Sequence, residues 1–303
     1  MPATPSVPST PPTTPSEEQP AGVSVDRRIA EHWTQRWDRQ QEEFLPEREA
    51  LFDALIDVVQ ESAGRPDPLV VDLGCGPGSI GARLLRRLPE ATVVSMDADP
   101  VLIALGRGAY GDVRGLRFVA ADLRLPEWVD RLGLARPVDA VVSSTALHWL
   151  DPSTLTSVYT AAAGLLRPGG VLVNCDELER DQDAAPTLAR LDRALLAREK
   201  ARWLGTGHGE GWYDWWERVL AEPALATAVA ERERQGFAGE HHSDLSAGIE
   251  DHRTALRDAG FAEVGTLWRR GEVQLLCAVT ASPDGVAVPT RPHTHNNAPA
   301  PRP

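Results

Sequence analysis

The protein has 303 residues, 42% of them hydrophobic and 25% charged, which is ordinary for a soluble chain that forms one large domain or two small ones. Its 31 basic residues against 44 acidic ones give a net charge of −13 that repels a phosphate backbone, so nucleic acid is not an expected partner. No apolar run reaches the roughly 18 residues of a membrane span, and the scattered cysteines Cys75, Cys175 and Cys277 favour a reducing, cytoplasmic location.

Both ends of the chain are rich in proline. Residues 1–24 contain seven prolines and residues 281–303 contain six, with few large apolar side chains, so we expect two disordered tails. The first tail also lacks the apolar run of a signal peptide. Residues 25–66 follow with the periodicity of two helices, expected over residues 25–44 and 47–61 and separated at Pro46.

Residues 67–176 alternate short β-branched runs with helical periodicity, which is typical of βαβ units. A Pro-Gly-Gly turn at residues 168–170 is expected to separate the last helix from the last strand. The pattern therefore predicts an α/β fold with a doubly wound, mostly parallel sheet. We expect its first five strands over residues 69–73, 92–97, 116–120, 140–143 and 171–175.

Residues 177–248 interrupt this alternation and are mainly helical in character. The spacing of Leu188, Leu191 and Leu195 predicts the buried apolar face of one helix. Four of the nine tryptophans lie within residues 203–216, and four glycines alternate over residues 205–211. We interpret this segment as a helical substrate cap, in which the glycine stretch is either a mobile lid or an ordinary surface loop.

Residues 249–280 return to the core pattern. A helix is expected up to Gly260, followed by two strands over residues 265–270 and 272–279. Because these strands are separated only around Gly271, we expect an antiparallel hairpin added to the edge of the parallel sheet.

The most informative motif follows the first strand and reads Val-Val-Asp-Leu-Gly-Cys-Gly-Pro-Gly-Ser over residues 70–79. Glycines let the backbone approach a ligand, and the helix that follows offers unpaired N–H groups. The spacing G-x-G-x-G differs from the G-x-G-x-x-G of dinucleotide-binding loops, because Ser79 stands where the third glycine would be. Asp72 would repel a pyrophosphate but suits a ligand with an ammonium group. The motif therefore argues against a nicotinamide cofactor.

Further carboxylates follow the second and third strands. Asp97 ends the second strand, where a carboxylate can accept both hydroxyls of a ribose. Asp122 follows the third strand, and its side chain together with the backbone N–H of Leu123 matches the edge of adenine. Asp99, directly before Pro100, is instead expected to cap a helix.

In this order and spacing, these residues resemble the class I S-adenosylmethionine-dependent methyltransferases, especially the small-molecule group with a D-L-G-C-G-x-G loop. The likeness is strong over residues 68–176 and looser over residues 254–280. It implies S-adenosylmethionine as the cofactor and a Rossmann-like seven-stranded sheet in the order 3-2-1-4-5-7-6. The implied cofactor contacts are Asp72, Gly74, Cys75 and Gly76 at the methionine part, Asp97 and Ala98 at the ribose, Asp122 and Leu123 at adenine, and Ser144 after the fourth strand.

In the resembled fold, the loop after the fourth strand faces the methyl group that is transferred, and His148 in that loop is the candidate catalytic residue. The sequence leaves open whether His148 is a general base, a pocket-lining residue or a structural one. Tryptophans are the expected acceptor contacts, although packing explains any one of them as well. They are Trp37 in the first helix, Trp149, and Trp212, Trp215 and Trp216 in the cap.

The loop after the fourth strand also limits the classes of acceptor that we expect. It lacks the Asn/Asp-Pro-Pro-Tyr motif of enzymes that methylate DNA bases or protein glutamine, so those acceptors are disfavoured. Residues 144–149 resemble small-molecule enzymes, including those that act on carboxylic acids such as trans-aconitate or on malonyl thioesters. We therefore expect methylation of oxygen or nitrogen in a small organic acceptor, in specialised metabolism.

Two other functions stay open at this stage: a nicotinamide-dependent oxidoreductase, and a non-catalytic module that binds S-adenosylmethionine. No metal is expected, because His208, His241 and His242 lack the spacing of a zinc site and no cysteine joins them.

Overall fold

The computed structural model describes residues 25–282, with short gaps at residues 43, 46, 180–182, 206–209 and 238–246. The expected tails, the glycine stretch at residues 206–209 and the histidines His208, His241 and His242 lie outside the described residues. Within the described part, no helix is both long and apolar enough to cross a membrane.

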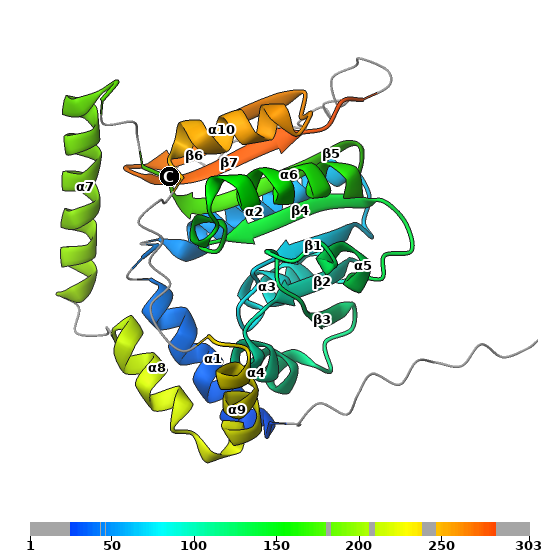
Figure 1. The fold of residues 1–303 in the computed structure, drawn as a ribbon, viewed down its shortest axis with the longest axis vertical. Helices are drawn as coiled ribbons and strands as arrows, with labels where there is room; N and C mark the ends of the chain where they lie inside the picture. The colour runs from blue at the N-terminus through cyan, green and yellow to red at the C-terminus, as the bar shows by residue number, and fades with distance from the viewer. Residues whose placement is uncertain are drawn as a thin grey trace, which may run out of the picture.

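A seven-stranded sheet forms the centre of the molecule (Figure 1). Its strand order is β3-β2-β1-β4-β5-β7-β6, which confirms the order implied by the sequence resemblance. Strands β1 to β5 are parallel, whereas β7 is antiparallel to both of its neighbours. The strands are β1 Leu69–Leu73, β2 Thr92–Asp97, β3 Leu116–Ala120, β4 Val138–Ser144, β5 Leu166–Glu177, β6 Glu263–Arg270 and β7 Val273–Val279.

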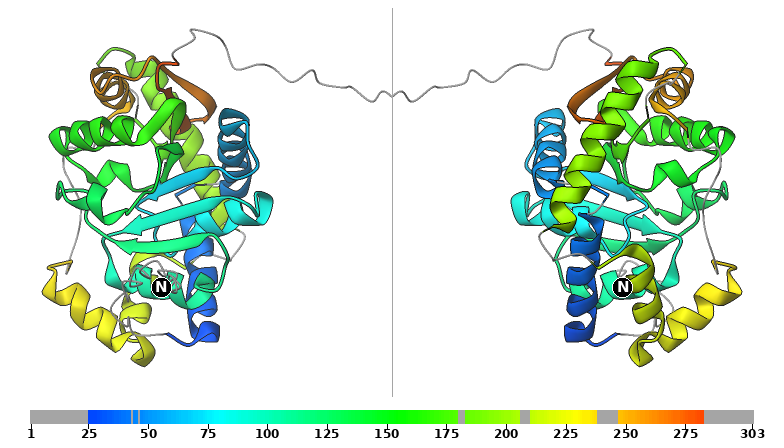
Figure 2. Two further views of the ribbon diagram at one scale, coloured as in Figure 1. Left: turned by 90° about the vertical axis from the view of Figure 1, so that its right-hand side faces the viewer. Right: turned by 90° about the vertical axis from the view of Figure 1, so that its left-hand side faces the viewer.

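Helices cover both faces of the sheet (Figure 2). α2 and α3 pack on one face, and α5, α6 and α10 pack on the other. The helices are α1 Arg27–Gln41, α2 Arg48–Ala63, α3 Ser79–Arg87, α4 Pro100–Tyr110, α5 Trp128–Arg131, α6 Pro152–Leu165, α7 Pro186–Leu204, α8 Trp212–Leu220, α9 Ala226–Arg234 and α10 Ile249–Asp258, with short 3₁₀ turns at Leu147–Trp149 and Pro223–Leu225.

Alternate side chains of each strand supply the two apolar layers. In β1, Leu69, Val71 and Leu73 pack on the side of α6, whereas Val70 packs on the side of α2 and α3. Because both faces are covered, all five residues of β1 are buried. This explains why the parallel strands have nearly continuous apolar sequences.

A third apolar cluster joins α1, α4, α8 and α9, which lie together in the lower part of Figure 1. Trp37 of α1 and Trp215 of α8 are central to it, with ring centroids 4.9 Å apart in an edge-to-face arrangement. Asp26 caps the start of α1 by accepting hydrogen bonds from the backbone N–H groups of Arg28 and Ile29. The N-terminal helix and the inserted helices therefore stabilise each other.

Helix α7 departs from its predicted packing. Its periodicity predicts a buried face for Leu188, Leu191 and Leu195, but these side chains are 51%, 44% and 54% exposed. Leu196 is buried instead, in the cluster formed with α2 and α3. The prediction was wrong because periodicity identifies an apolar stripe without identifying the element that covers it.

Strand β5 begins earlier than predicted. It starts at Leu166, directly after α6, so that Pro168, Gly169 and Gly170 lie inside the strand and do not form a separate turn. The pairing with β4 shifts register at this point, between Val138 and Ala140. A register irregularity accommodates the proline, which has no backbone N–H to donate.

Trp215 and Tyr213 of α8 provide a matched test of the third cluster. Trp215 is fully buried and Tyr213 is 65% exposed. We expect Trp215→Ala to lower the free energy of unfolding by about 3–5 kcal/mol, because it removes a buried indole, and Tyr213→Ala to change it by less than about 0.5 kcal/mol. Urea denaturation followed by circular dichroism measures both values, and equal losses in the two variants would contradict this packing.

Candidate active site

The loop between β1 and α3 is held by its glycines. Gly74, Gly76 and Gly78 have φ angles of +66°, +54° and +92°, which disfavour other residues. A Cβ on Gly74 would clash with the side chain of Ala146, and one on Gly76 would lie 3.3 Å from the ring of Trp37. The glycine loop is therefore packed between α1 and the segment that follows β4.

Asp72 is a buried carboxylate just before this loop. Its Oδ2 lies 3.4 Å from the hydroxyl of Ser95, whereas its buried Oδ1 has no hydrogen-bond partner among the described residues. Burial, with the added charge of Asp97, raises the pKa of Asp72 to about 7. A cationic ligand group at Oδ1 would satisfy the orphaned oxygen and favour the charged form.

Asp97 holds the loop as well as ending β2. Its Oδ2 accepts a hydrogen bond of 2.8 Å from the backbone N–H of Gly76, and its Oδ1 accepts one of 2.9 Å from the N–H of Asp99. Burial raises the pKa of Asp97 to about 6. A carboxylate offers about four lone pairs, so acceptor capacity remains for a ribose hydroxyl beside these backbone donors, to which Ala98 also belongs. Ala98 lies between the two aspartates at this turn.

Asp99 caps α4, as its position before Pro100 predicts, by accepting hydrogen bonds from the N–H groups of Val101 and Leu102.

Asp122 follows β3, and both of its carboxylate oxygens accept hydrogen bonds from Arg124. An adenine amine would therefore share this carboxylate with the guanidinium group. Leu123 is partly buried against the core.

Cys75 lies in the glycine loop and is buried. Burial, together with the charges of Asp72 and Asp97, raises the pKa of its thiol well above the ordinary value. The thiolate, which is the nucleophilic form of cysteine, is therefore disfavoured, and Cys75 acts as a small loop residue.

The loop after β4 contains an interaction that the sequence does not reveal. Nδ1 of His148 lies 2.7 Å from Oδ1 of Asp176, which is fully buried near the end of β5. Burial by itself would lower the pKa of His148, but the charge and hydrogen bond of Asp176 outweigh it and raise this pKa. Asp176 directly follows a predicted strand, as Asp122 nearly does, so the same pattern of carboxylates at strand ends could have identified it.

Three of the five expected tryptophans, Trp37, Trp149 and Trp212, lie close to one another near His148. The ring of Trp149 lies 4.9 Å from that of His148 and 6.4 Å from that of Trp212, and Trp212 in turn lies 5.7 Å from Trp37. Phe44, which sequence reasoning missed, lies 6.1 Å from Trp212. These four aromatic residues, Trp37, Phe44, Trp149 and Trp212, are called the aromatic group below.

The other two tryptophans of the expected set have different surroundings. Trp215 is fully buried and packs against Trp33 and Trp37, so it belongs to the core of the third cluster. The guanidinium of Arg232 lies 4.4 Å above the ring of Trp216. Arg232 also forms an ion pair of 2.7 Å with Asp99, which connects α9 to the start of α4.

The backbone is strained at Thr145, which lies between the end of β4 and the turn that contains His148. Its φ angle is +47°, which is unusual for a β-branched residue. Thr145 directly follows Ser144, the last residue of β4. Its hydroxyl donates a hydrogen bond of 3.2 Å to Oε1 of Gln41 in α1. The N-terminal helix therefore contacts both the glycine loop and the loop that carries His148.

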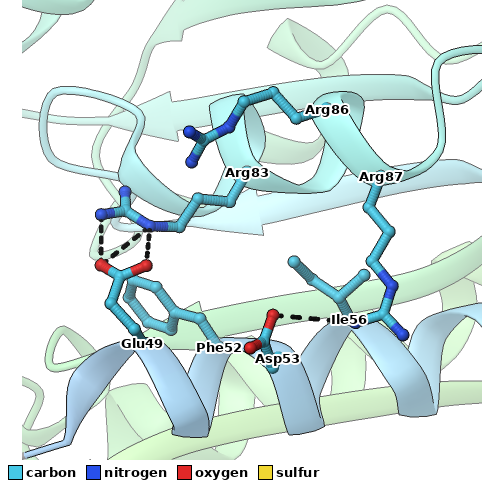
Figure 3. Close-up of a pocket in the computed structure, with 7 residues that line it drawn as sticks. All are labelled: Glu49, Phe52, Asp53, Ile56, Arg83, Arg86 and Arg87. Atoms are coloured by element: carbon cyan, nitrogen blue, oxygen red, sulfur yellow. Dashed lines mark hydrogen bonds and ion pairs between the residues drawn. The ribbon is translucent and has the colours of Figure 1, made fainter.

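A separate cavity of about 230 Å³ lies between α2 and α3 (Figure 3). Four of its charged groups form the ion pairs Arg83–Glu49 and Arg87–Asp53. None of the residues expected at the cofactor or the acceptor lines it. No group of three or more His, Cys, Asp or Glu side chains in the described ranges could hold a metal ion.

Comparisons with known proteins agree on one class. Residues 70–170 match the family model described as a methyltransferase domain. A trans-aconitate 2-methyltransferase of Azoarcus sp. (strain BH72) is 36% identical over 180 residues, which cover 55% of this chain and 65% of that protein. An uncharacterised methyltransferase of Mycobacterium bovis is 36% identical over 121 residues, 40% of this chain and 55% of that protein. The chain thus spans less than two thirds of the length of these relatives.

Among solved structures, an O-methyltransferase family protein from Burkholderia thailandensis is 23% identical, with a TM-score of 0.48 and coverage of 84% of this chain and 71% of that one. Residues 70–170 are therefore a methyltransferase domain, and the strand order is the one implied by the sequence resemblance to the class I S-adenosylmethionine-dependent methyltransferases. S-adenosylmethionine is the cofactor of this class.

Gly74 and Gly64 allow the contact at the glycine loop to be tested separately from backbone strain. Both have φ angles near +65°, but a Cβ on Gly64 meets nothing within 4 Å. We expect Gly64→Ala to cost about 1–2 kcal/mol of stability from the left-handed backbone alone. Gly74→Ala should cost about 1–3 kcal/mol more, because it also pushes against Ala146. Chemical denaturation measures both variants, and an equal cost would mean that the loop yields freely at Gly74.

Proposed function

We propose that this protein binds S-adenosylmethionine along the ends of β1, β2 and β3 and transfers its methyl group to a small organic acceptor. The observation that carries this proposal is the orphaned oxygen of the buried Asp72 beside a glycine loop with no room for side chains. Because Asp72 lies near the carboxyl end of β1 and Asp176 near that of the parallel strand β5, donor and acceptor would bind at the same edge of the sheet.

Each cofactor contact has a physical basis in these residues. Asp72 would bind the ammonium group of the methionine part, and the backbone of Gly74 and Gly76 would allow close approach. Asp97 would accept a ribose hydroxyl through its remaining acceptor capacity, with Ala98 beside it. When bound, S-adenosylmethionine supplies a methyl group that is already activated by a positively charged sulfur. The protein then has mainly to align the acceptor and to accept a proton.

The remaining cofactor contacts would lie farther along the edge. Asp122 and the backbone N–H of Leu123 would bind adenine, and Ser144 at the end of β4 would contact the cofactor near the His148 loop. Cys75 would contribute through its backbone, since its thiol is protonated and buried.

The acceptor would lie between His148 and the aromatic group, because aromatic faces bind apolar and cationic molecules well. Trp37, Trp149 and Trp212 are the proposed acceptor contacts, and Trp216 lies next to them. A small molecule fits this setting better than nucleic acid, given the net charge of −13. The three buried free cysteines support a cytoplasmic location, and we place the reaction in specialised metabolism.

Cofactor affinity should depend on pH through Asp72. The carboxyl group has a pKa of about 7 in the folded protein and is therefore largely neutral at pH 5.5. Binding of a cation requires the charged form, so affinity should rise as pH increases from 5.5 to 7 and binding should release protons over this range. Calorimetry in two buffers with different ionisation enthalpies measures both the affinity and the protons released.

Two variants identify the group responsible. Asp72→Asn should bind S-adenosylmethionine at least about tenfold more weakly and lose the part of the pH dependence centred near pH 7, since a charge-assisted contact contributes about 1.5–3 kcal/mol, whereas the part due to Asp97, with a pKa of about 6, should remain. Asp122→Asn should weaken binding but keep the pH dependence. An Asp72→Asn protein with the original affinity and pH profile would rule out the ammonium site.

A ligand comparison tests the function itself. Melting temperature should rise with S-adenosylmethionine and S-adenosylhomocysteine but not with NAD. Stabilisation by NAD instead would favour the oxidoreductase alternative. Incubation with methyl-labelled cofactor and a panel of small acceptors then separates an enzyme from a non-catalytic binding module, which would transfer no label.

A further inference from the structure

The His148–Asp176 pair has a defined polarity. Oδ1 of Asp176 accepts the backbone N–H of Glu177 at 2.9 Å as well as the contact from Nδ1 of His148 at 2.7 Å. An ionised carboxylate can only accept hydrogen bonds, so the proton of a neutral imidazole must lie on Nδ1. Nε2 then carries the lone pair, and it forms no hydrogen bond with the residues described.

The two ends of the His148 ring lie in different surroundings. Asp176 is fully buried, whereas the side chain of His148 is 26% exposed. Trp149 lies against the imidazole ring and connects it to Trp212 of the aromatic group. The buried carboxylate therefore fixes one nitrogen, and the other remains available on the side where we place the acceptor.

The charged groups around His148 are largely paired with one another. The titratable groups that act on it are Asp176 and Glu177 of β5 and His252 of α10. His252 is buried, and burial lowers its pKa, so it is neutral at physiological pH. Asp176 would neutralise a protonated His148, whereas Glu177 already forms an ion pair of 3.0 Å with Lys200 of α7. The His148–Asp176 pair is therefore well suited to accept a proton.

We propose that Asp176 is a positioning residue that holds His148 as a general base, and that the acceptor is a neutral hydroxyl compound with a flat apolar body, such as a phenol. This inference rests on the proposed methyl transfer. It differs from what the name of the similar trans-aconitate methyltransferases suggests, because an ionised carboxylate has no proton to lose and needs no base.

The transfer balances without any further reactant. The acceptor oxygen forms a bond to the methyl carbon as the carbon–sulfur bond breaks, and the electron pair of that bond stays on sulfur. The hydroxyl proton passes to Nε2 of His148, and Asp176 stabilises the imidazolium that forms. The proton later leaves to solvent, since His148 is partly exposed.

The first experiment needs no acceptor. NMR of protein labelled at histidine, with His148→Gln used to assign the signal, reports which nitrogen is protonated and the pKa of the ring. We expect the proton on Nδ1 and a pKa that falls in Asp176→Asn, because the favourable negative charge is lost. Asp176→Glu, which keeps the charge, should restore part of the shift. A proton on Nε2, or a pKa unchanged in Asp176→Asn, would overturn the positioning role.

The second experiment tests the acceptor class. Methyl-labelled S-adenosylmethionine is incubated with simple phenols and aromatic alcohols on one side and with trans-aconitate and citrate on the other. We expect label in the hydroxyl compounds only, with kcat rising with pH up to the pKa of His148 and then levelling off. Transfer to the carboxylates alone, no transfer to any hydroxyl probe, or a rate that falls as His148 loses its proton would overturn the proposal.

Variants separate a chemical role from a structural one. His148→Gln should lower kcat by about 10²-fold or more, with the loss shrinking at high pH where the phenol ionises unaided. Asp176→Asn should also lower kcat and move the rising limb of the pH profile to lower pH. Asp139→Asn is the matched control, because Asp139 is another fully buried carboxylate but lies at the opposite end of β4, paired with Arg136 and Arg167. It should lower stability and leave the pH profile unchanged.

Cofactor calorimetry on the same variants keeps this inference distinct from the proposed function. If the wild-type protein fails to bind S-adenosylmethionine, the proposed function fails. If all variants bind it normally and only the acceptor results disagree, the base and the acceptor class are wrong and the cofactor site stands.

Discussion

The parallel register of β1 to β5 determines where the polar groups of this protein meet. In a parallel sheet all strands end at the same edge, so Asp72, Asp97 and Asp176 come together from distant parts of the chain. Burying carboxylates is costly unless other groups bind them. Here the glycine loop donates to Asp97, and His148 donates to Asp176. Asp72 and Asp176 each keep one buried oxygen without a hydrogen-bond partner among the described residues, and the oxygen of Asp72 belongs to the residue just before the glycine loop, where a cationic ligand would satisfy it.

The helices outside the sheet decide what lies opposite this edge. α1 places Trp37 against Gly76 and Gln41 against Thr145, so it contacts two of the loops that form the site. α8 adds Trp212 to the same aromatic group. Because Trp215 joins α8 to α1 in a fully buried contact, the acceptor side depends on the same packing that stabilises the helical cluster.

Ion pairs hold the helices of this cluster in place, and one of them reaches the turn after β2. Arg232 of α9 pairs with Asp99, which caps α4 directly after Asp97. Arg36 of α1 binds Glu210, just before α8, with one contact at 2.9 Å. Both pairs are largely shielded from solvent, so breaking either one would leave a charge in a poorly hydrated place. The inserted helices are therefore positioned by charge at their ends and by aromatic packing between them.

Much of the fold can be read from the sequence, because its signals are local. β1, β2 and β3 have the predicted bounds, since β-branched runs end at Gly or Asp turns that no tertiary contact needs to explain. The strand order followed from the resemblance carried by the loop over residues 70–79, and the cap at Asp99 followed from its position before proline. These features depend on neighbours along the chain or on motifs with fixed spacing.

Other features were decided only by tertiary structure, because they depend on which distant surfaces meet. Periodicity could not reveal that Leu191 of α7 is exposed or that Trp215 is core while Trp212 faces Trp149. His148 follows β4 and Asp176 lies near the end of β5, and the sequence alone does not show that these two side chains are in contact. By itself the sequence determined the class of fold, the glycine loop after β1 and most of the acidic and aromatic residues from which the site is proposed. The packing of α1 and α8 against the sheet edge decided how those residues are paired, since pairing requires burial and distance that only the folded chain creates.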